Sequence, residues 1–88
     1  VSEAVVRAMA EGARRVTGAD FAIATSGIAG PGGGTDDKPV GTLWLAVSGP
    51  NGTTAMLRFF PGLDRGRFKT LAAWSAMGLL RRETLALD

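Results

Sequence analysis

The 88-residue sequence contains no cysteine, no histidine and no tyrosine. Without cysteine the chain has neither a disulfide nor a thiolate metal site, which fits a reducing cytoplasm. Without histidine it cannot form a Ser-His-Asp or Cys-His catalytic group by itself, and it lacks the usual zinc ligands. The groups left for chemistry are hydroxyls, carboxylates, lysine and arginine.

Long apolar runs and strong charge are also absent. No stretch approaches the roughly 18 residues of a membrane span, and no signal peptide is visible, so we expect a cytoplasmic protein with no membrane partner. The chain contains ten basic and eight acidic residues, which leaves only a small positive net charge. No aromatic residues interleave with the basic ones, so we expect no nucleic-acid partner. With 45% apolar residues the chain forms one small domain at most. Because it begins with Val1, we expect a processed, excised or fragmentary chain.

The first segment, Ser2 to Val16, is predicted to be a helix. Ser2 is a good N-cap, and Gly18 suits the left-handed residue that ends many helices. Apolar residues recur on one face at helical spacing. This face, predicted to be buried, consists of Val5, Met9, Gly12 and Val16.

Three segments are typical of strands: Phe21–Thr25, Thr42–Ser48 and Thr53–Phe60. The second is an almost unbroken apolar run, which indicates a strand covered on both faces. The sequence Gly-Pro-Asn-Gly at positions 49–52 predicts a turn that joins the second and third strands into a hairpin.

Asp64 is predicted to cap a last helix that runs to about Leu85. Its predicted buried stripe consists of Phe68, Leu71, Ala72, Ser75 and Leu79, with Trp74 beside it. We expect both Trp44 and Trp74 to pack in the core. The order helix-strand-strand-strand-helix predicts an α/β fold, a mixed sheet with helices packed on it. Two helices give little cover to such apolar strands, so we expect that a partner layer is missing.

The segment between the first two strands, TSGIAGPGGGTDDKPVG at positions 25–41, contains the densest cluster of glycines. It does not match the P-loop, because Gly33 and Gly34 stand where that motif needs lysine and a hydroxyl residue. It does not match the dinucleotide-binding motif either, because Asp37 stands where the third glycine is needed after Gly32 and Gly34. Glycines nevertheless let backbone N–H groups point into a concavity, and ligands bind where strands of α/β proteins end. The pattern favours a ligand-binding loop, and a flexible connection is the alternative.

Other charged groups give weaker signals. Adjacent Asp36 and Asp37 point apart in most conformations, so we expect no metal site. Arg65, Arg67 and Lys69 could form an anion-binding patch, but solvated first turns of a helix explain them more simply.

The run SGIAGPGGG, followed by Lys-Pro-Val-Gly-Thr at positions 38–42, resembles the CinA C-terminal domain, the nicotinamide-nucleotide amidase (PncC-type) family. The resemblance covers essentially the whole chain. That family's domain is about twice as long, and its N-terminal half carries an E-S-x-T-G-G segment with the proposed catalytic serine. The segment is absent here. The resemblance therefore implies that residues 1–88 are the C-terminal half of a larger three-layer α/β/α domain, inactive alone, with an unknown catalytic residue.

The resemblance implies hydrolysis of the carboxamide of nicotinamide mononucleotide to nicotinate mononucleotide and ammonia, without metal or cofactor. It also implies three partners: the nucleotide substrate, the missing N-terminal half, and further copies in a homo-oligomer. The alternative is a non-catalytic nucleotide-binding or regulatory module. The residues implied to bind substrate are Ser26, Gly27, Ile28, Ala29, Gly30, Pro31, Gly32, Gly33, Gly34 and, at the mouth of the pocket, Lys38.

Overall fold

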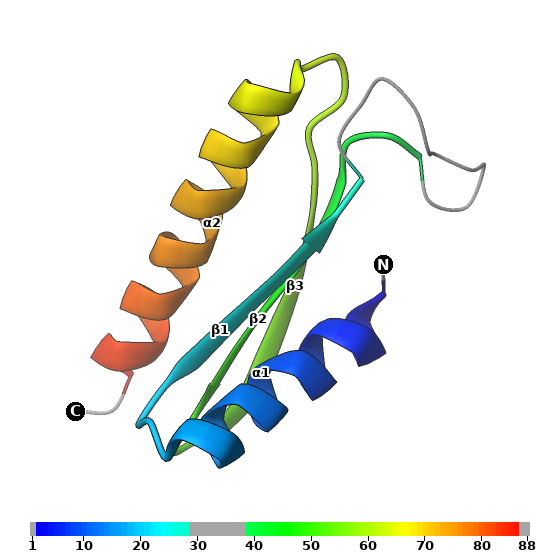
Figure 1. The fold of residues 1–88 in the computed structure, drawn as a ribbon. Helices are drawn as coiled ribbons and strands as arrows, with labels where there is room; N and C mark the ends of the chain where they lie inside the picture. The colour runs from blue at the N-terminus through cyan, green and yellow to red at the C-terminus, as the bar shows by residue number, and fades with distance from the viewer. Residues whose placement is uncertain (1, 29–38, 87–88) are drawn as a thin grey trace.

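The computed structural model of the protein describes residues 2–28 and 39–86. It contains α1 (Glu3–Thr17), β1 (Ala22–Gly27), β2 (Thr42–Gly49), β3 (Gly52–Phe59) and α2 (Arg65–Leu85). This confirms the predicted order of one helix, three strands and one helix. The strands form a single sheet in the order β1-β2-β3, and α1 and α2 lie on opposite faces of it (Figure 1).

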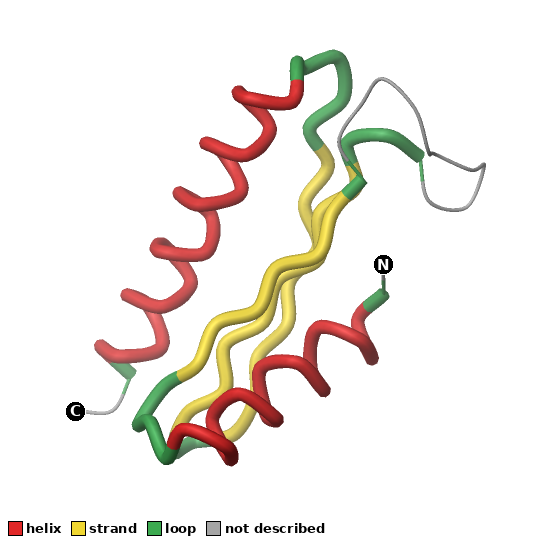
Figure 2. The backbone as a smooth tube through the Cα atoms, in the orientation of Figure 1, coloured by secondary structure: helices red, strands yellow, loops and turns green. Residues whose placement is uncertain are grey.

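Both strand pairs among the described residues are antiparallel. The mixed sheet that the sequence predicts would need a parallel neighbour beside an edge strand, and these residues contain none. The β2–β3 hairpin ends in a Gly49–Gly52 pair, as the Gly-Pro-Asn-Gly sequence predicts. The central strand β2 runs between its two neighbours in Figure 2, which explains its near-continuous burial.

The α2 face of the sheet holds the larger core. Because side chains alternate along a strand, every second residue of β2 points to this face. There they pack against apolar side chains of α2, with partly buried Phe21 and Met56 around them. The buried cluster consists of Leu43, Leu45, Val47, Phe68 and Leu79.

The α1 face has a smaller core made largely of alanine. Val6 and Ala10 of α1 pack on Ala24 of β1 and Ala46 of β2, and Trp44 is partly buried beside them as predicted. Alanines let the helix lie close to the sheet. Arginines on α1 also donate hydrogen bonds to backbone oxygens at the hairpin end of β2 and β3: Arg7 Nη1 to Thr53 O (2.7 Å) and Arg14 Nη1 to Gly49 O (2.9 Å).

The prediction of which face of α1 is buried is therefore wrong. Val5, Met9 and Val16 are 45%, 47% and 83% exposed. The helix has two apolar faces, and the small one fits against the alanines of the sheet. Hydropathy spacing counts apolar residues but does not measure how closely they can approach, so it selected the bulkier face.

The predicted helix ends are confirmed. Ser2 Oγ accepts a hydrogen bond from Val5 N at 3.2 Å, and Gly18 ends α1 with a left-handed φ of 71°. The Asp64 carboxylate accepts from Arg67 N at 2.8 Å and caps α2. Each cap satisfies a backbone group that a helix terminus leaves without an intrahelical partner.

The buried stripe of α2 is confirmed only in part. Phe68 and Leu79 are buried, but Ala76 is buried as well, and Trp74 is 71% exposed rather than in the core. The helix is apolar on several sides, so its spacing does not single out one face. It lies over β1 and β2 rather than β3, which turns the Trp74 flank away from the sheet.

Candidate functional site

The two ends of the glycine-rich loop are hydrogen-bonded to each other at one end of the sheet. We call these paired residues, Ile28 and Pro39–Thr42, the neck of the loop. Ile28 N donates to Thr42 O at 2.9 Å, and Gly41 N donates to Ile28 O at 2.7 Å. Thr42 Oγ1 donates to Pro39 O at 2.6 Å. The two ends of the loop are therefore tied to each other by backbone pairing that continues the β1–β2 ladder.

Gly41 is required at this neck. Its φ is +99°, and a Cβ there would lie 2.8 Å from Phe60 O, whose own amide donates to Gly41 O at 2.9 Å. Any larger residue at position 41 would have to push the backbone of Phe60 away and distort this hydrogen bond.

Most of the predicted substrate-binding residues fall outside the described residues. These are Ala29, Gly30, Pro31, Gly32, Gly33, Gly34 and Lys38, and the same is true of Asp36 and Asp37. Ser26, Gly27 and Ile28 are placed, and they stand where β1 ends and the loop begins.

A pocket of about 400 Å³ opens beside this neck, between the end of β1 and the first turns of α2. Its apolar floor comes from β2 and α2, and its polar groups come from β1 and α2. The lining residues are Thr25, Gly27, Ile28, Leu43, Arg65, Phe68, Lys69 and Ala72. Of the three predicted substrate-binding residues that the structure describes, Gly27 and Ile28 line this pocket.

Gly27 is small because Phe68 needs the space. A Cβ on Gly27 would lie 2.9 Å from the Phe68 ring and 3.1 Å from Thr42 O. The glycine thus lets the ring of Phe68 lie directly against the end of β1. This contact joins the base of the loop to α2 and shapes the floor of the pocket.

The neighbouring hydroxyls of Thr25 and Ser26 belong to opposite faces of the sheet. Thr25 lines the pocket on the α2 face. Ser26 pairs with Trp44, which packs on the α1 side, and paired residues share a face. Ser26 is therefore not part of the pocket wall, and its predicted role in substrate binding remains a prediction.

Arg65 and Lys69 place two cations on the same pocket. They stand one helical turn apart on α2, so both face the pocket, and neither forms an ion pair with a carboxylate among residues 2–28 and 39–86. The explanation that the sequence favoured, solvated helix turns, fits Arg67, which lies at 3.8 Å from Asp64 away from the lining. The i, i+4 spacing of Arg65 and Lys69 was the signal that could have found them.

The electrostatics of the pocket favour an anion. Its lining contains two cations and no carboxylate, and it lies beside the N-terminal turns of α2, where the helix dipole adds positive potential. Within the described part of the chain no three acidic side chains gather as a metal site would require. In the same part, neither helix is long and apolar enough to cross a membrane.

Comparison with known protein sequences gives a family model and relatives that carry the name CinA. The family model described as CinA C-terminal domain matches residues 1–84. A CinA-like protein of Anaeromyxobacter dehalogenans is 57% identical over 81 residues, which is 92% of this chain and 20% of that protein. Another CinA-like protein, from Parasynechococcus marenigrum, is 56% identical over 98% of this chain. The chain thus spans about a fifth of the length of the curated relatives it matches.

Solved structures share the fold. The competence damage-inducible protein A of Klebsiella pneumoniae superposes with a TM-score of 0.89 at 38% identity, covering 100% of this chain and 54% of that one. The competence/damage inducible protein CihA of Agrobacterium tumefaciens gives a TM-score of 0.88 at 35% identity, covering 93% of this chain and 50% of that one. The helix-strand-strand-strand-helix unit is therefore about half of each of these structures.

Proposed function

Because the chain belongs to the CinA C-terminal domain family, we propose that it supplies the substrate pocket of a nicotinamide-nucleotide amidase. The net reaction is hydrolysis of the carboxamide of nicotinamide mononucleotide: one water is consumed, the C–N bond of the amide breaks, and nicotinate mononucleotide and ammonia are released. In this proposal residues 1–88 are the C-terminal half of the amidase domain. The nucleophile lies in the other half, as the length of the solved relatives permits.

The observation that carries the proposal is the pocket beside the neck of the glycine loop. Nicotinamide mononucleotide joins a flat ring to a phosphate. Arg65 and Lys69 provide cations for the phosphate, and arginine in particular binds phosphate oxygens in pairs. Leu43 and Phe68 provide an apolar floor for the ring. The volume of about 400 Å³ falls within the range of roughly 300–1,000 Å³ typical of small-molecule sites.

The loop itself is assigned to the reacting carboxamide. Amide hydrolysis develops an oxyanion that needs preorganised donors. Ile28 N is already used at the neck, so we assign oxyanion donation to the glycine segment 29–34. Lys38 is assigned to the mouth of the pocket. Thr25 adds a hydroxyl on the pocket side, while Ser26 would reach substrate only from the α1 face.

We also propose that the working protein combines this chain with the other half of the domain and with further copies of itself. Large apolar side chains lie on the outside of both helices, with Val16 83% and Trp74 71% exposed. Exposed apolar surface of this kind is typical of sites where other protein surfaces pack.

The alternative function is a nucleotide-binding or regulatory module without turnover. It is favoured by the absence of histidine and cysteine from this chain and by the names of the relatives, which refer to competence and damage rather than to an amidase. Both functions use the same pocket, so only turnover separates them.

Two measurements on the intact protein test the proposal. Isothermal titration with nicotinamide mononucleotide reports binding, and an ammonia-release assay reports hydrolysis. We expect both. Saturable binding without ammonia release would establish the regulatory alternative, and the absence of both would refute a nucleotide site altogether.

Adjacent substitutions locate the substrate on one face of the sheet. Thr25→Val keeps the shape and removes the hydroxyl in the pocket, and we expect it to raise KM. Ser26→Ala removes the neighbouring hydroxyl on the α1 face and serves as the matched comparison. If Ser26→Ala raised KM and Thr25→Val did not, the substrate would lie outside the pocket described here.

A further inference from the structure

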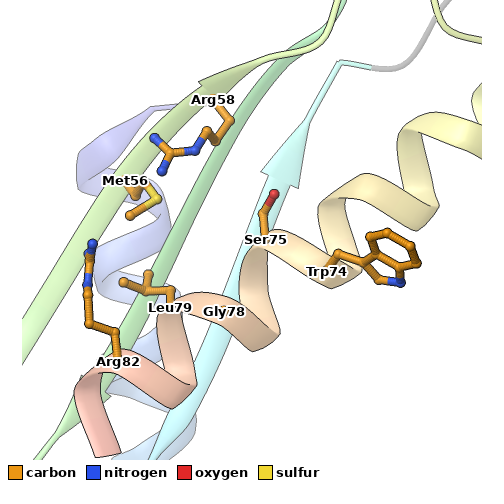
Figure 3. Close-up of a pocket in the computed structure, with 7 residues that line it drawn as sticks. All are labelled: Met56, Arg58, Trp74, Ser75, Gly78, Leu79 and Arg82. Atoms are coloured by element: carbon orange, nitrogen blue, oxygen red, sulfur yellow. The ribbon is translucent and has the colours of Figure 1, made fainter. Parts of the chain in front are cut away.

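A second hollow of about 340 Å³ lies on the other flank of α2, between that helix and β3 (Figure 3). Met56 and Arg58 line it from β3. The remaining lining residues come from α2 and are Trp74, Ser75, Gly78, Leu79 and Arg82. None of these residues lines the pocket beside the neck, here called the Gly27 pocket, which lies on the β1 side of the helix.

The groove lies where α2 is closer to β1 and β2 than to β3. Gly78 widens it, since a Cβ built there would have no atom within 4 Å. The floor of the groove is apolar and packed into the core. Leu79 is 2% exposed and belongs to the main core, and Met56 packs against that core.

Two guanidinium groups reach into this groove. Arg58 and Arg82 come from elements far apart in the sequence, and Figure 3 shows both reaching toward the side of the groove that Met56 occupies. Neither forms an ion pair with a carboxylate in the described ranges 2–28 and 39–86. Arg58 Nη1 donates to Leu57 O at 3.2 Å, which leaves its other donors free for a ligand.

Glu83 follows Arg82 directly in the sequence. Its carboxylate accepts a hydrogen bond from Thr54 Oγ1 at 2.5 Å on β3, and among the described residues it forms no ion pair with Arg58 or Arg82. The groove lining itself contains no acidic residue. Two like charges directed into one hollow repel each other, and an anion placed between them reverses the sign of that energy.

We propose that this groove is a second binding site, which takes a small organic anion. The phosphate or carboxylate group of the ligand sits between Arg58 and Arg82, because guanidinium groups bind both anions through paired hydrogen bonds. The apolar part of the ligand covers Met56 and Leu79, and Ser75 offers a hydroxyl beside them. The Trp74 ring points away from the groove in Figure 3, so stacking on an aromatic base plays no part.

The competing explanation is that the two arginines lay their aliphatic stems on apolar surface and keep their charges in water. That explanation predicts no ligand. The proposal is also independent of the amidase function, because no groove residue lines the Gly27 pocket. Its failure would leave the proposed substrate site untouched.

The test uses the intact protein with three probes: phenyl phosphate, benzoate and neutral benzyl alcohol. Isothermal titration gives the affinity, and amide chemical shifts give the location. We expect saturable binding of at least one anion, with shifts at Ser75 and Gly78, and none for benzyl alcohol. Phenyl phosphate against benzoate identifies which anionic group the site selects.

Matched variants complete the test. Arg58→Gln and Arg82→Gln should each weaken binding about tenfold or more, the effect of losing a hydrogen bond to a charged group. Arg81→Gln removes the same charge from the neighbouring position outside the groove and should leave affinity unchanged. Equal effects of Arg81→Gln and Arg82→Gln, shifts confined to Gly27 and Lys69, or no saturable binding would each overturn the proposal.

Discussion

The two faces of the sheet are built in different ways. On the α1 face, alanines let a helix lie close to the strands, and the core is thin. On the α2 face, leucine, valine and phenylalanine hold the helix above the sheet, and α2 covers two strands of the three. Both the Gly27 pocket and the Arg58 groove lie on this second face.

The difference shows where the two proposed sites lie. The large side chains of the α2 face leave a hollow along each flank of that helix. A further hollow of about 550 Å³ lies between the end of α1 and the hairpin end of the sheet, so the size of the core side chains does not by itself decide where hollows form.

The largest effect is expected in the core of the α2 face. Leu45 is fully buried in the middle of β2, so Leu45→Ala should lower the free energy of unfolding by about 2–5 kcal/mol. Urea unfolding measures this. Leu57→Ala, at a 51% exposed position of β3, is the matched control and should cost far less. Equal losses would mean that the two strands are packed alike.

The opposite substitution probes the α1 face. Ala46→Leu adds volume where Val6 and Ala10 approach the sheet, and we expect a loss of roughly 1–3 kcal/mol from overpacking. Ala13→Leu, on the exposed side of the same helix, should be close to neutral. If the Ala46→Leu protein were as stable as the parent, the packing between α1 and the sheet would have space for a larger side chain.

Gly27→Ala tests the contact that joins the loop to α2. The new Cβ would lie 2.9 Å from the Phe68 ring, which lines the pocket, and 3.1 Å from Thr42 O. We expect a stability loss of about 1–2 kcal/mol together with a raised KM for nicotinamide mononucleotide. A stability loss with KM unchanged would separate the glycine from the substrate site.

Gly18→Ala has the smallest expected effect. The residue has open space around it, so the cost of about 1 kcal/mol comes only from its left-handed backbone. Thermal unfolding should show a lowered Tm with ammonia release unaffected. A greater loss than that of Gly27→Ala would contradict the steric reasoning at Gly27.

The sequence predicts the order of elements, the caps and the hairpin because each depends on local chemistry. Ser2, Asp64 and the Gly-Pro-Asn-Gly turn act within a few residues of themselves. It does not predict which face of a helix is buried when several are apolar, as Val5 and Trp74 show. That choice depends on how closely the helix can approach the sheet.

The candidate site divides in the same way. The glycine pattern indicates the loop, and the structure places Gly27 and Ile28 in a pocket. Arg65 and Lys69 join that pocket only through packing of α2 on the sheet, some forty residues later in the chain. Their i, i+4 spacing places both on one side of α2, but nothing local to them shows that this side borders a pocket.

The role of the pocket can be tested by the KM for nicotinamide mononucleotide, measured by ammonia release from the intact protein carrying Arg65→Gln or Arg67→Gln. Both remove one charge from the first turn of α2, but only Arg65 lines the pocket. We expect Arg65→Gln to raise KM about tenfold and Arg67→Gln to leave it unchanged. Equal KM values for the two variants would show that the substrate does not bind in this pocket.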